Sequence, residues 1–266
     1  MDRRKTTRDI AKQYLNGDKL TMVTCYDYTF ARLVQRADID VILIGDSLGN
    51  VVQGHDTTLP VEVDDIIYHS RAVARGNSSA LILADMPFLS YQANDDEGVR
   101  QAGRMLKEGG AQAVKVEGGA HLAPMIERMV RAGIPVCGHL GLTPQSVHAF
   151  GGFHVQARSE DAADRLMQDA LALQAAGAFM IVLEMVPADL AARVTQALQI
   201  PTIGIGAGAQ TSGQVLVIYD LLGLNKDFRP KFLKHFASLE ETVIQALEAY
   251  RDEVRSGAYP DDDHSF

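Results

Sequence analysis

The sequence lacks the features that mark secreted, membrane-spanning or nucleic-acid-binding proteins. Two cysteines, Cys25 and Cys137, are too few for a disulfide framework and fit a reducing compartment. No apolar run approaches the roughly 18 residues of a membrane span, and no apolar stretch follows the charged start as in a secretory signal. Acidic residues outnumber basic ones, 34 to 25, so the surface does not attract phosphate backbones. We therefore expect a cytoplasmic protein that binds neither nucleic acid nor membrane.

The composition is that of a folded domain. Of the 266 residues, 47% are apolar and 22% are charged, both close to globular averages. No linker-like stretch divides the chain, so we expect one domain over residues 1–266. It would carry an N-terminal extension of about residues 1–19 and a short acidic, solvated tail from about residue 257. Each cysteine is expected to be a buried, inert thiol.

Eight short apolar runs recur along the chain and predict the fold class. They are rich in Val, Ile and Leu without strict polar alternation, as in strands covered on both faces. The runs are Leu20–Thr24, Val41–Gly45, Leu81–Ala84, Ala113–Val116, Pro135–Gly138, Met180–Leu183, Pro201–Gly204 and Val215–Ile218. Helical patterns lie between them, for example Leu122–Val130 before Gly133, and a helix after Ser159 as N-cap. This alternation predicts an α/β fold, a (β/α)₈ TIM barrel, rather than an open sheet.

Two segments repeat one pattern. A Gly-Ala pair at Gly110 and again at Gly177 precedes an apolar run, and a glutamate follows seven residues after the glycine. These glutamates are Glu117 and Glu184. Two equivalent strand–helix units of one barrel would have this appearance, which places both glutamates at the same height.

Ionisable side chains follow five consecutive runs, at the barrel end that carries active sites. They are Asp46, Asp85, Glu117, His139 and Glu184. Lys115 lies two residues before Glu117 in the same strand and so points to the same side. Asp46, Asp85 and Glu117 would converge and raise one another's pKa, which a divalent cation would resolve. Hard oxygen ligands with open positions favour Mg²⁺, with Mn²⁺ or Ca²⁺ as alternatives.

Structural explanations compete with these catalytic ones. An acidic residue after a strand is often a helix N-cap, although capping is a poor explanation for four such residues together. Lys115 and Glu117 could form a pair without function, and such pairs stabilise little. His139 could be a core or rim histidine. The Gly204–Gly208 loop could cradle phosphate but fits a tight turn better, and Phe150–Phe153 could hinge a lid or be an ordinary loop.

Ordered strings around these residues closely resemble the ketopantoate hydroxymethyltransferase family. The resemblance runs from about Leu20 to the C-terminus, with no departure at a functional position, and leaves Met1–Lys19 unmatched. The strings are Thr24–Asp27, Gly45–Gly49, Gln53–Pro60, Ala84–Phe88, Val114–Gly119, Val136–Ser146, Leu183–Glu184 and Gly204–Gly208.

The resemblance implies a decameric barrel enzyme of pantothenate biosynthesis. Members transfer a hydroxymethyl group from 5,10-methylenetetrahydrofolate to 3-methyl-2-oxobutanoate, giving 2-dehydropantoate. It implies that Asp46, Asp85 and Glu117 bind Mg²⁺. By the same resemblance Asp46, Ser47, Asp85 and Lys115 contact the oxo acid, and Glu184 accepts the proton. His139 could assist proton movement or hold the substrate.

Two other functions compete with this interpretation. One is another Mg²⁺-dependent barrel enzyme of oxo-acid enolate chemistry, such as an isocitrate lyase-like carbon–carbon lyase. It should use a different proton-transfer group, often a cysteine on a mobile loop, and neither Cys25 nor Cys137 is expected in one. The other is a non-catalytic binding protein that kept the barrel. It should have lost some of the metal carboxylates or Glu184, and all are present.

Overall fold

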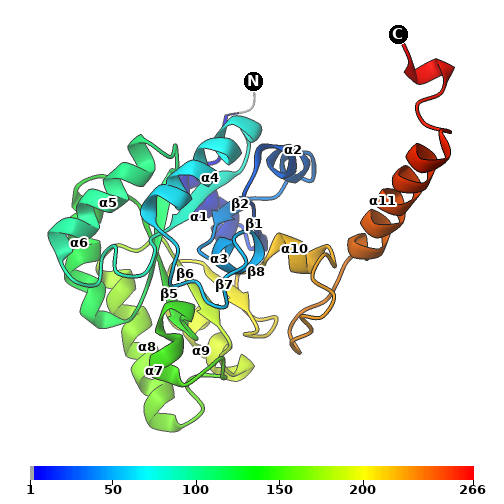
Figure 1. The fold of residues 1–266 in the computed structure, drawn as a ribbon. Helices are drawn as coiled ribbons and strands as arrows, with labels where there is room; N and C mark the ends of the chain where they lie inside the picture. The colour runs from blue at the N-terminus through cyan, green and yellow to red at the C-terminus, as the bar shows by residue number, and fades with distance from the viewer. Residues whose placement is uncertain (1–2) are drawn as a thin grey trace. The chain divides into compact units, whose positions relative to one another are not determined.

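The computed structural model describes residues 3–266 and contains a closed barrel of eight parallel strands in chain order (Figure 1). The strands are β1 (Leu20–Thr24), β2 (Val41–Ile44), β3 (Leu81–Asp85), β4 (Ala113–Glu117), β5 (Val136–Gly141), β6 (Met180–Glu184), β7 (Thr202–Ile205) and β8 (Gly213–Leu216). Every predicted run contributes a strand, and β8 pairs with β1 to close the sheet. The predicted (β/α)₈ barrel is therefore confirmed.

The chain divides into two compact units, Met1–Val217 and Ile218–Phe266. The first unit contains the barrel and its helices α1 (Thr7–Leu15), α2 (Tyr28–Arg36), α3 (Leu48–Val51), α4 (Val63–Gly76), α5 (Asp95–Lys107), η1 (Ala120–Leu122), α6 (Ala123–Arg131), η2 (Pro144–Ser146), α7 (Val147–Phe150), α8 (Glu160–Ala175) and α9 (Ala188–Ala197). The second contains α10 (Ile218–Leu221), α11 (Leu239–Ser256) and η3 (Asp262–His264). One domain over the whole chain stays a prediction.

Two strands, β5 and β8, differ from the predicted runs by more than one residue at an end. β5 continues to Gly141, so His139 lies inside the strand and not after it, because His139 and Leu140 go on pairing with β6. β8 begins at Gly213, and Ile218 opens α10. Pairing with β1 and β7 extends this last strand over residues that are not apolar, and hydrophobicity alone could not have indicated them.

The segment before β1 belongs to the barrel core. Thr6 and Asp9 form a capping box at the start of α1, which stabilises the first turn of that helix. Ile10 of α1 is fully buried in the apolar cluster that also includes Leu20 and Met22 of β1. Burying such a side chain contributes about 1.5–3 kcal/mol. Helix α1, within the predicted N-terminal extension, thus places Ile10 in the same core as the strands.

Other helix ends follow local sequence signals. Ser159 accepts a hydrogen bond from the backbone N–H of Ala162 and caps α8, as predicted.

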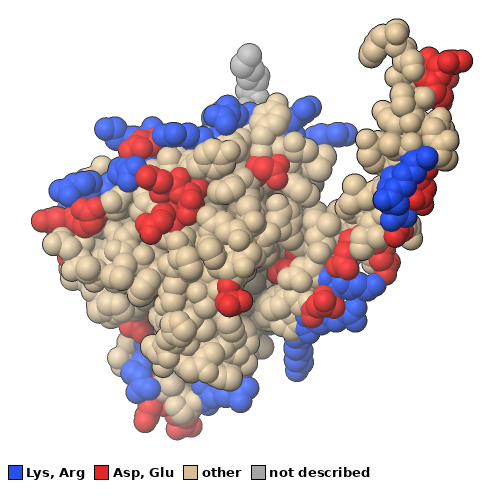
Figure 2. All heavy atoms as spheres, viewed as in Figure 1, with Lys and Arg blue, Asp and Glu red and all other residues tan. Residues whose placement is uncertain are grey.

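On the barrel face shown in Figure 2, acidic and basic side chains are interspersed. Arg104 Nη2, for example, lies 2.6 Å from Asp64 Oδ1. Within residues 3–266, none of the helices combines the length and apolar character that a membrane crossing requires.

Candidate active site

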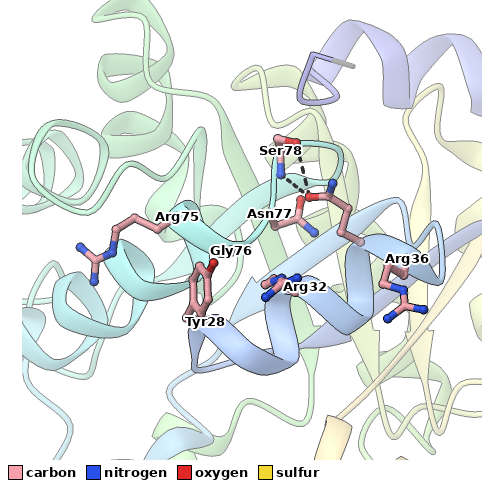
Figure 3. A pocket seen from close by; sticks show the side chains of 8 residues that line it. Tyr28, Arg32, Arg36, Arg75, Gly76, Asn77 and Ser78 are labelled. Carbon is pink, nitrogen blue, oxygen red and sulfur yellow. Dashed lines mark hydrogen bonds between the residues drawn. The ribbon is translucent and has the colours of Figure 1, made fainter. Parts of the chain in front are cut away.

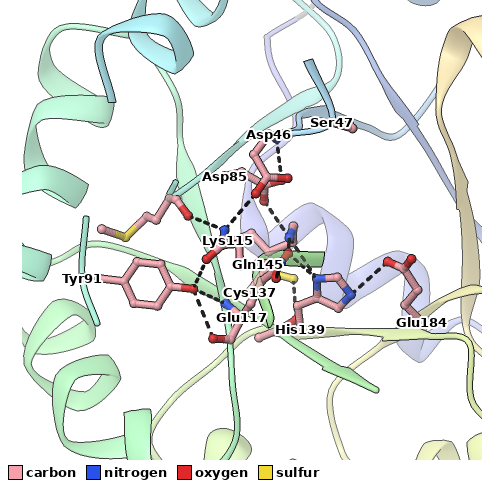
Figure 4. Close-up of polar contacts among 12 residues, drawn as sticks. Asp46, Ser47, Asp85, Tyr91, Lys115, Glu117, Cys137, His139, Gln145 and Glu184 are labelled. Carbon is pink, nitrogen blue, oxygen red and sulfur yellow. Dashed lines mark hydrogen bonds and ion pairs between the residues drawn. The ribbon is translucent and has the colours of Figure 1, made fainter. Parts of the chain in front are cut away.

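The barrel brings the predicted polar residues together at the carboxyl ends of β2 to β6 (Figure 4). The six ionisable ones are Asp46, Asp85, Lys115, Glu117, His139 and Glu184. Register explains why they meet. Asp85 pairs with Lys115 across β3 and β4, and Glu117 pairs with His139 across β4 and β5. Glu184 pairs with Gly141, two residues beyond His139. Strands in such barrels are staggered by about one residue per strand, so this offset keeps Glu117 and Glu184 in one layer.

Lys115 lies at the centre of this cluster. Its Nζ is 2.8 Å from Asp85 Oδ1, 3.4 Å from Glu117 Oε1 and 3.0 Å from His139 Nδ1. The lysine side chain is only 4% exposed. Burial lowers the pKa of Lys115, but the carboxylates of Asp85, Glu117 and Asp46 outweigh burial and raise this pKa well above its usual value. The lysine is therefore a charged ammonium held by several strands.

The carboxylates still carry more negative charge than Lys115 compensates. Burial raises the pKa of Asp46 well above its usual value, and the neighbouring charges of Asp85 and Glu117 raise it further. Burial also raises the pKa of Asp85, despite the attraction of Lys115. Burial opposes ionisation of Glu117 as well, but Lys115 and His139 lower the pKa of Glu117 to about 2. The cluster is thus an acidic site with room for another positive charge.

Glu184 stands apart from the three other carboxylates and contacts His139. Its Oε2 lies 3.2 Å from His139 Nε2, whereas Nδ1 of the same ring lies 3.2 Å from Glu117 Oε1. The Glu184 side chain is 16% exposed, against 2% for Glu117. Burial and Lys115 lower the pKa of His139, but Glu117 and Glu184 outweigh them and raise it to about 9. The His139 imidazole therefore lies between the buried carboxylate of Glu117 and the more accessible carboxylate of Glu184.

The backbone at Glu184 is held from both sides. Its carbonyl accepts a hydrogen bond from the Leu142 N–H at 2.8 Å. Gly141 beside it has φ +92°, and a Cβ there would lie 2.2 Å from the Glu184 carbonyl oxygen. Met185, the next residue, has φ 45°, an uncommon value for a non-glycine residue that is found often at functional sites. This strained residue directly follows Glu184 in the chain.

The residues that occupy the helix N-caps test the hypothesis that the acidic residues at the strand ends are capping residues. Ser47 precedes α3 and contacts the hydroxyl of Tyr26 through its Oγ at 2.8 Å. The N-cap positions of η1, α5 and α9 are Gly119, Asn94 and Pro187. None of the four predicted acidic residues is an N-cap of these elements. Their position after strands is therefore not explained by helix capping.

Gln145 and Tyr91 are site residues that sequence reasoning missed. The side chain of Gln145 donates to Asp46 Oδ2 at 2.9 Å, and its backbone N–H donates to Glu117 Oε2 at 3.0 Å. The Tyr91 hydroxyl contacts Gln145 Oε1 and accepts from the Glu117 backbone N–H, both at 2.9 Å. Gln145 stands inside the string Val136–Ser146, so its presence was visible but its contacts were not. Tyr91 lies between β3 and α5, beyond the string Ala84–Phe88, so no motif marked it.

The donor chemistry of the cluster fits a hard divalent cation. Asp46, Asp85 and Glu117 supply only carboxylate oxygens. Burial raises the pKa of both aspartates, and neighbouring carboxylates raise that of Asp46 further. As the described residues stand, however, no three of their His, Cys, Asp or Glu side chains form a ready metal site. The carboxylates are arranged around Lys115 instead. Cation binding would require side-chain adjustment in which Lys115 gives up part of its pairing.

The cysteines and glycine-rich segments take no part in this cluster's polar contacts with the predicted residues. Cys25 follows β1 directly and Cys137 lies within β5, and both are free and fully buried. Burial raises the pKa of Cys25 to about 11 and that of Cys137 to about 12, so both stay protonated, inert thiols. Gly206 and Gly208 have positive φ values, as the tight-turn interpretation requires. The Phe150–Phe153 segment ends α7 at a left-handed Gly151.

A hollow of about 350 Å³ lies between α2 and the end of α4 (Figure 3). Its lining includes Arg32, Arg36 and Arg75, and the Arg32 guanidinium lies 5.8 Å from the ring centre of Tyr28. None of the residues predicted from the sequence lines it. Its basic character sets it apart from the acidic cluster at the strand ends.

Fold and site together define a parallel-barrel enzyme with an acidic cluster at the carboxyl ends of its strands. The chain belongs to the ketopantoate hydroxymethyltransferase family, whose model matches residues 4–262. That match begins well before Leu20, from which the resemblance was expected to run, and includes most of the segment left unmatched. The chain is 57% identical over 250 residues to the 3-methyl-2-oxobutanoate hydroxymethyltransferase of Moorella thermoacetica, covering 94% of this chain and 93% of that protein. It is 54% identical to the protein of that name from Pelobacter propionicus, over 100% of this chain and 98% of the relative.

Solved structures share the fold at low sequence identity. Phosphonopyruvate hydrolase in complex with oxalate and Mg²⁺ aligns with a TM-score of 0.63 and 13% identity, over 98% of this chain and 93% of that one. The 2,3-dimethylmalate lyase of the PEP mutase/isocitrate lyase superfamily aligns with a TM-score of 0.60 and 18% identity, over 98% and 91%. At such identities the likeness establishes the barrel alone.

Proposed function

We propose that this chain transfers a hydroxymethyl group from 5,10-methylenetetrahydrofolate to 3-methyl-2-oxobutanoate, forming 2-dehydropantoate. The observation that carries the proposal is full-length identity above 50% to proteins named 3-methyl-2-oxobutanoate hydroxymethyltransferase. The clustering of Asp46, Asp85, Lys115 and Glu117 beside Glu184 supports it, because this reaction needs a polarised carbonyl and a separate base.

The residues that would hold Mg²⁺ are Asp46, Asp85 and Glu117. When bound, Mg²⁺ supplies positive charge that polarises the keto group and stabilises the enolate formed when C3 loses its proton. Lys115 would add a second positive charge near the oxo-acid oxygens, and Ser47 would offer a hydroxyl to the same substrate. These roles for the residues remain proposals.

Glu184 would remove the C3 proton. It is outside the inner carboxylate group, more exposed than Glu117, and within 3.2 Å of His139 Nε2. The contact with His139 would steady the orientation of Glu184, so we assign the histidine an accessory role. The resulting enolate would attack the one-carbon unit of the folate, forming the new carbon–carbon bond as the carbon–nitrogen bonds of that unit break. Water supplies the hydroxyl oxygen, and tetrahydrofolate leaves.

We also propose that the chain forms a homo-oligomer, a decamer by the family resemblance. Helix α11 carries apolar side chains at helical spacing that are 44–62% exposed in the single chain, among them Val243, Leu247 and Tyr250. Such a stripe is typical of an interface. Light scattering on the wild type and on Leu247→Glu tests this, with dissociation expected in the variant. The expected cytoplasmic location stays a prediction.

The decisive test is turnover with both substrates, with and without a chelator. We expect 2-dehydropantoate only when oxo acid, methylenetetrahydrofolate and Mg²⁺ are all present. Cleavage of a carbon–carbon bond without folate would favour a lyase of the isocitrate lyase-like class instead. Binding of the oxo acid with no product under any condition would favour a non-catalytic protein.

A further inference from the structure

Gln145 joins the segments at the ends of four successive strands, β2 to β5. It lies in the 3-10 turn Pro144–Ser146 that follows β5, and it is 5% exposed. Its Nε2 donates to Asp46 Oδ2 after β2 and to the Met86 carbonyl after β3, both at 2.9 Å. Its backbone N–H donates to Glu117 Oε2 at the end of β4. One residue thus touches two of the three carboxylates proposed to hold the cation.

The Gln145 amide is fully satisfied, which fixes its orientation. Its Oε1 faces the hydroxyl of Tyr91 at 2.9 Å and Nε2 of Gln92 at 2.8 Å. An amide has two donor hydrogens and one acceptor oxygen with two lone pairs, so all its capacity is used. The Met86 carbonyl can only accept, hence Nε2 must be the atom that faces it and Asp46. The amide cannot flip or turn away without leaving buried polar groups unpaired, which is costly.

We infer that Gln145 is a positioning residue that holds Asp46 and Glu117 in place for the cation. It contacts one oxygen of each carboxylate, Oδ2 of Asp46 and Oε2 of Glu117. The other Glu117 oxygen, Oε1, is directed to Lys115 and His139. A neutral amide suits this position, because a cationic donor would compete with the divalent cation for the same carboxylates. The inference rests on the proposed function only through the cation site.

The test measures Mn²⁺ binding in the absence of substrate. The electron paramagnetic resonance signal of free Mn²⁺ monitors the binding. Gln145→Met keeps the length of the side chain but removes its hydrogen-bond donors and its acceptor. Partners that orient metal ligands are typically worth 10–100-fold in metal affinity, so we expect the Mn²⁺ dissociation constant to rise by about that factor. Saturating Mg²⁺ should then restore most of kcat, which an unfolded fraction would not allow.

Gln112→Met is the matched control. Gln112 lies just before β4, at the opposite end of the strand from Glu117. It also uses its amide, accepting from the Ile82 N–H at 3.2 Å and donating to the Lys5 carbonyl at 2.9 Å. This variant should lose stability yet keep wild-type Mn²⁺ affinity. A loss equal to that of Gln145→Met would make the effect generic and overturn the inference.

Two further outcomes separate the inference from the proposed function. Wild-type Mn²⁺ affinity in folded Gln145→Met overturns the role of Gln145 and leaves the proposed function untouched. A wild-type protein that binds no Mn²⁺ overturns both. If Gln145→Met does not fold, Gln145→Asn replaces it, since the shorter side chain keeps an amide but withdraws its nitrogen from Asp46 Oδ2. Wild-type affinity in that variant would equally overturn the inference.

Discussion

Lys115 and Asp85 occupy paired positions on β4 and β3, and the lysine Nζ lies 2.8 Å from Asp85 Oδ1. This contact is shorter than the 3.4 Å between Lys115 and Glu117. Both side chains of the closer pair are almost fully buried. A residue on the neighbouring strand, rather than the glutamate two positions along the chain, is therefore the closer partner of the ammonium.

Replacing Lys115 by Met should separate its roles in stability and in binding. Removing one partner of a buried ionic group typically costs about 3–5 kcal/mol, because the remaining charge is uncompensated. We expect a lower melting temperature in the presence of a chelator and partial recovery with Mg²⁺, which can replace the lost charge. We also expect a raised KM for the oxo acid. Thermal melting and steady-state kinetics measure both, and an unchanged KM would make Lys115 purely structural.

Asp85→Ala should weaken the binding of both Mg²⁺ and the oxo acid. The variant removes a proposed ligand and also the closest partner of Lys115, which would then draw nearer to Glu117. Because the oxo acid is expected to bind largely through the cation, its affinity should fall with that of Mg²⁺. Isothermal titration calorimetry with each ligand measures this. Wild-type oxo-acid affinity with chelator present would contradict the proposed site.

Glu184→Gln should abolish proton abstraction and leave cation binding intact. The amide is nearly isosteric but cannot accept the C3 proton at neutral pH, and a general base contributes about 10²–10⁴-fold in rate. We expect the wild type to exchange the C3 hydrogen of 3-methyl-2-oxobutanoate for deuterium when Mg²⁺ is present. The exchange should fall by that factor in the variant, as followed by nuclear magnetic resonance.

A surface change provides the control for the Glu184 experiment. Glu127→Gln alters an exposed glutamate on α6 that pairs with Arg131, and exchange should stay at the wild-type rate. If Glu184→Gln exchanged normally, another group would be the base, with His139 the first candidate. If it failed to bind Mg²⁺, Glu184 would belong to the cation site and its assigned role would be wrong.

Protonation of Asp40 should lower the stability of the protein in acid. Burial raises its pKa, but Lys5, 2.5 Å away, and hydrogen bonds from Thr21 outweigh burial and hold this pKa below its usual value. With the folded pKa below the unfolded value, the unfolded state binds more protons in acid. The stabilisation is thus present above the unfolded pKa of about 4 and is lost as the pH falls through the folded value.

Asp40→Asn should therefore lower the free energy of unfolding at pH 7 by about 1–3 kcal/mol. It should also flatten the dependence of stability on pH below about pH 4. Asp38→Asn is the matched control, because Asp38 lies 4.0 Å from the same lysine but its side chain is 88% exposed. Exposed ion pairs contribute little, so its unfolding curve in denaturant should match the wild type. Equal losses in both variants would contradict the account.

Strand positions and the identity of the acidic residues could be predicted because they depend on local pattern. Runs of Val, Ile and Leu gave eight strands, and a parallel barrel places every strand's carboxyl end on one face. That geometry alone predicted that Asp46, Asp85, Glu117 and Glu184 would gather there. The ends of β5 and β8 were predicted less well, because pairing with neighbours, and not apolar character, decides where a strand stops.

Periodicity, spacing and ordered strings were sufficient to predict the barrel, the family and the ionisable groups that line one face. Which of these groups touch depends on the three-dimensional fold. The strand register places Asp85 beside Lys115. The connections after β3 and β5 place Tyr91 and Gln145 in contact with Glu117, and Ile10 of α1 packs in the core. Such contacts join residues far apart in the chain. Their geometry depends on the closure of the whole sheet, so no local pattern encodes it.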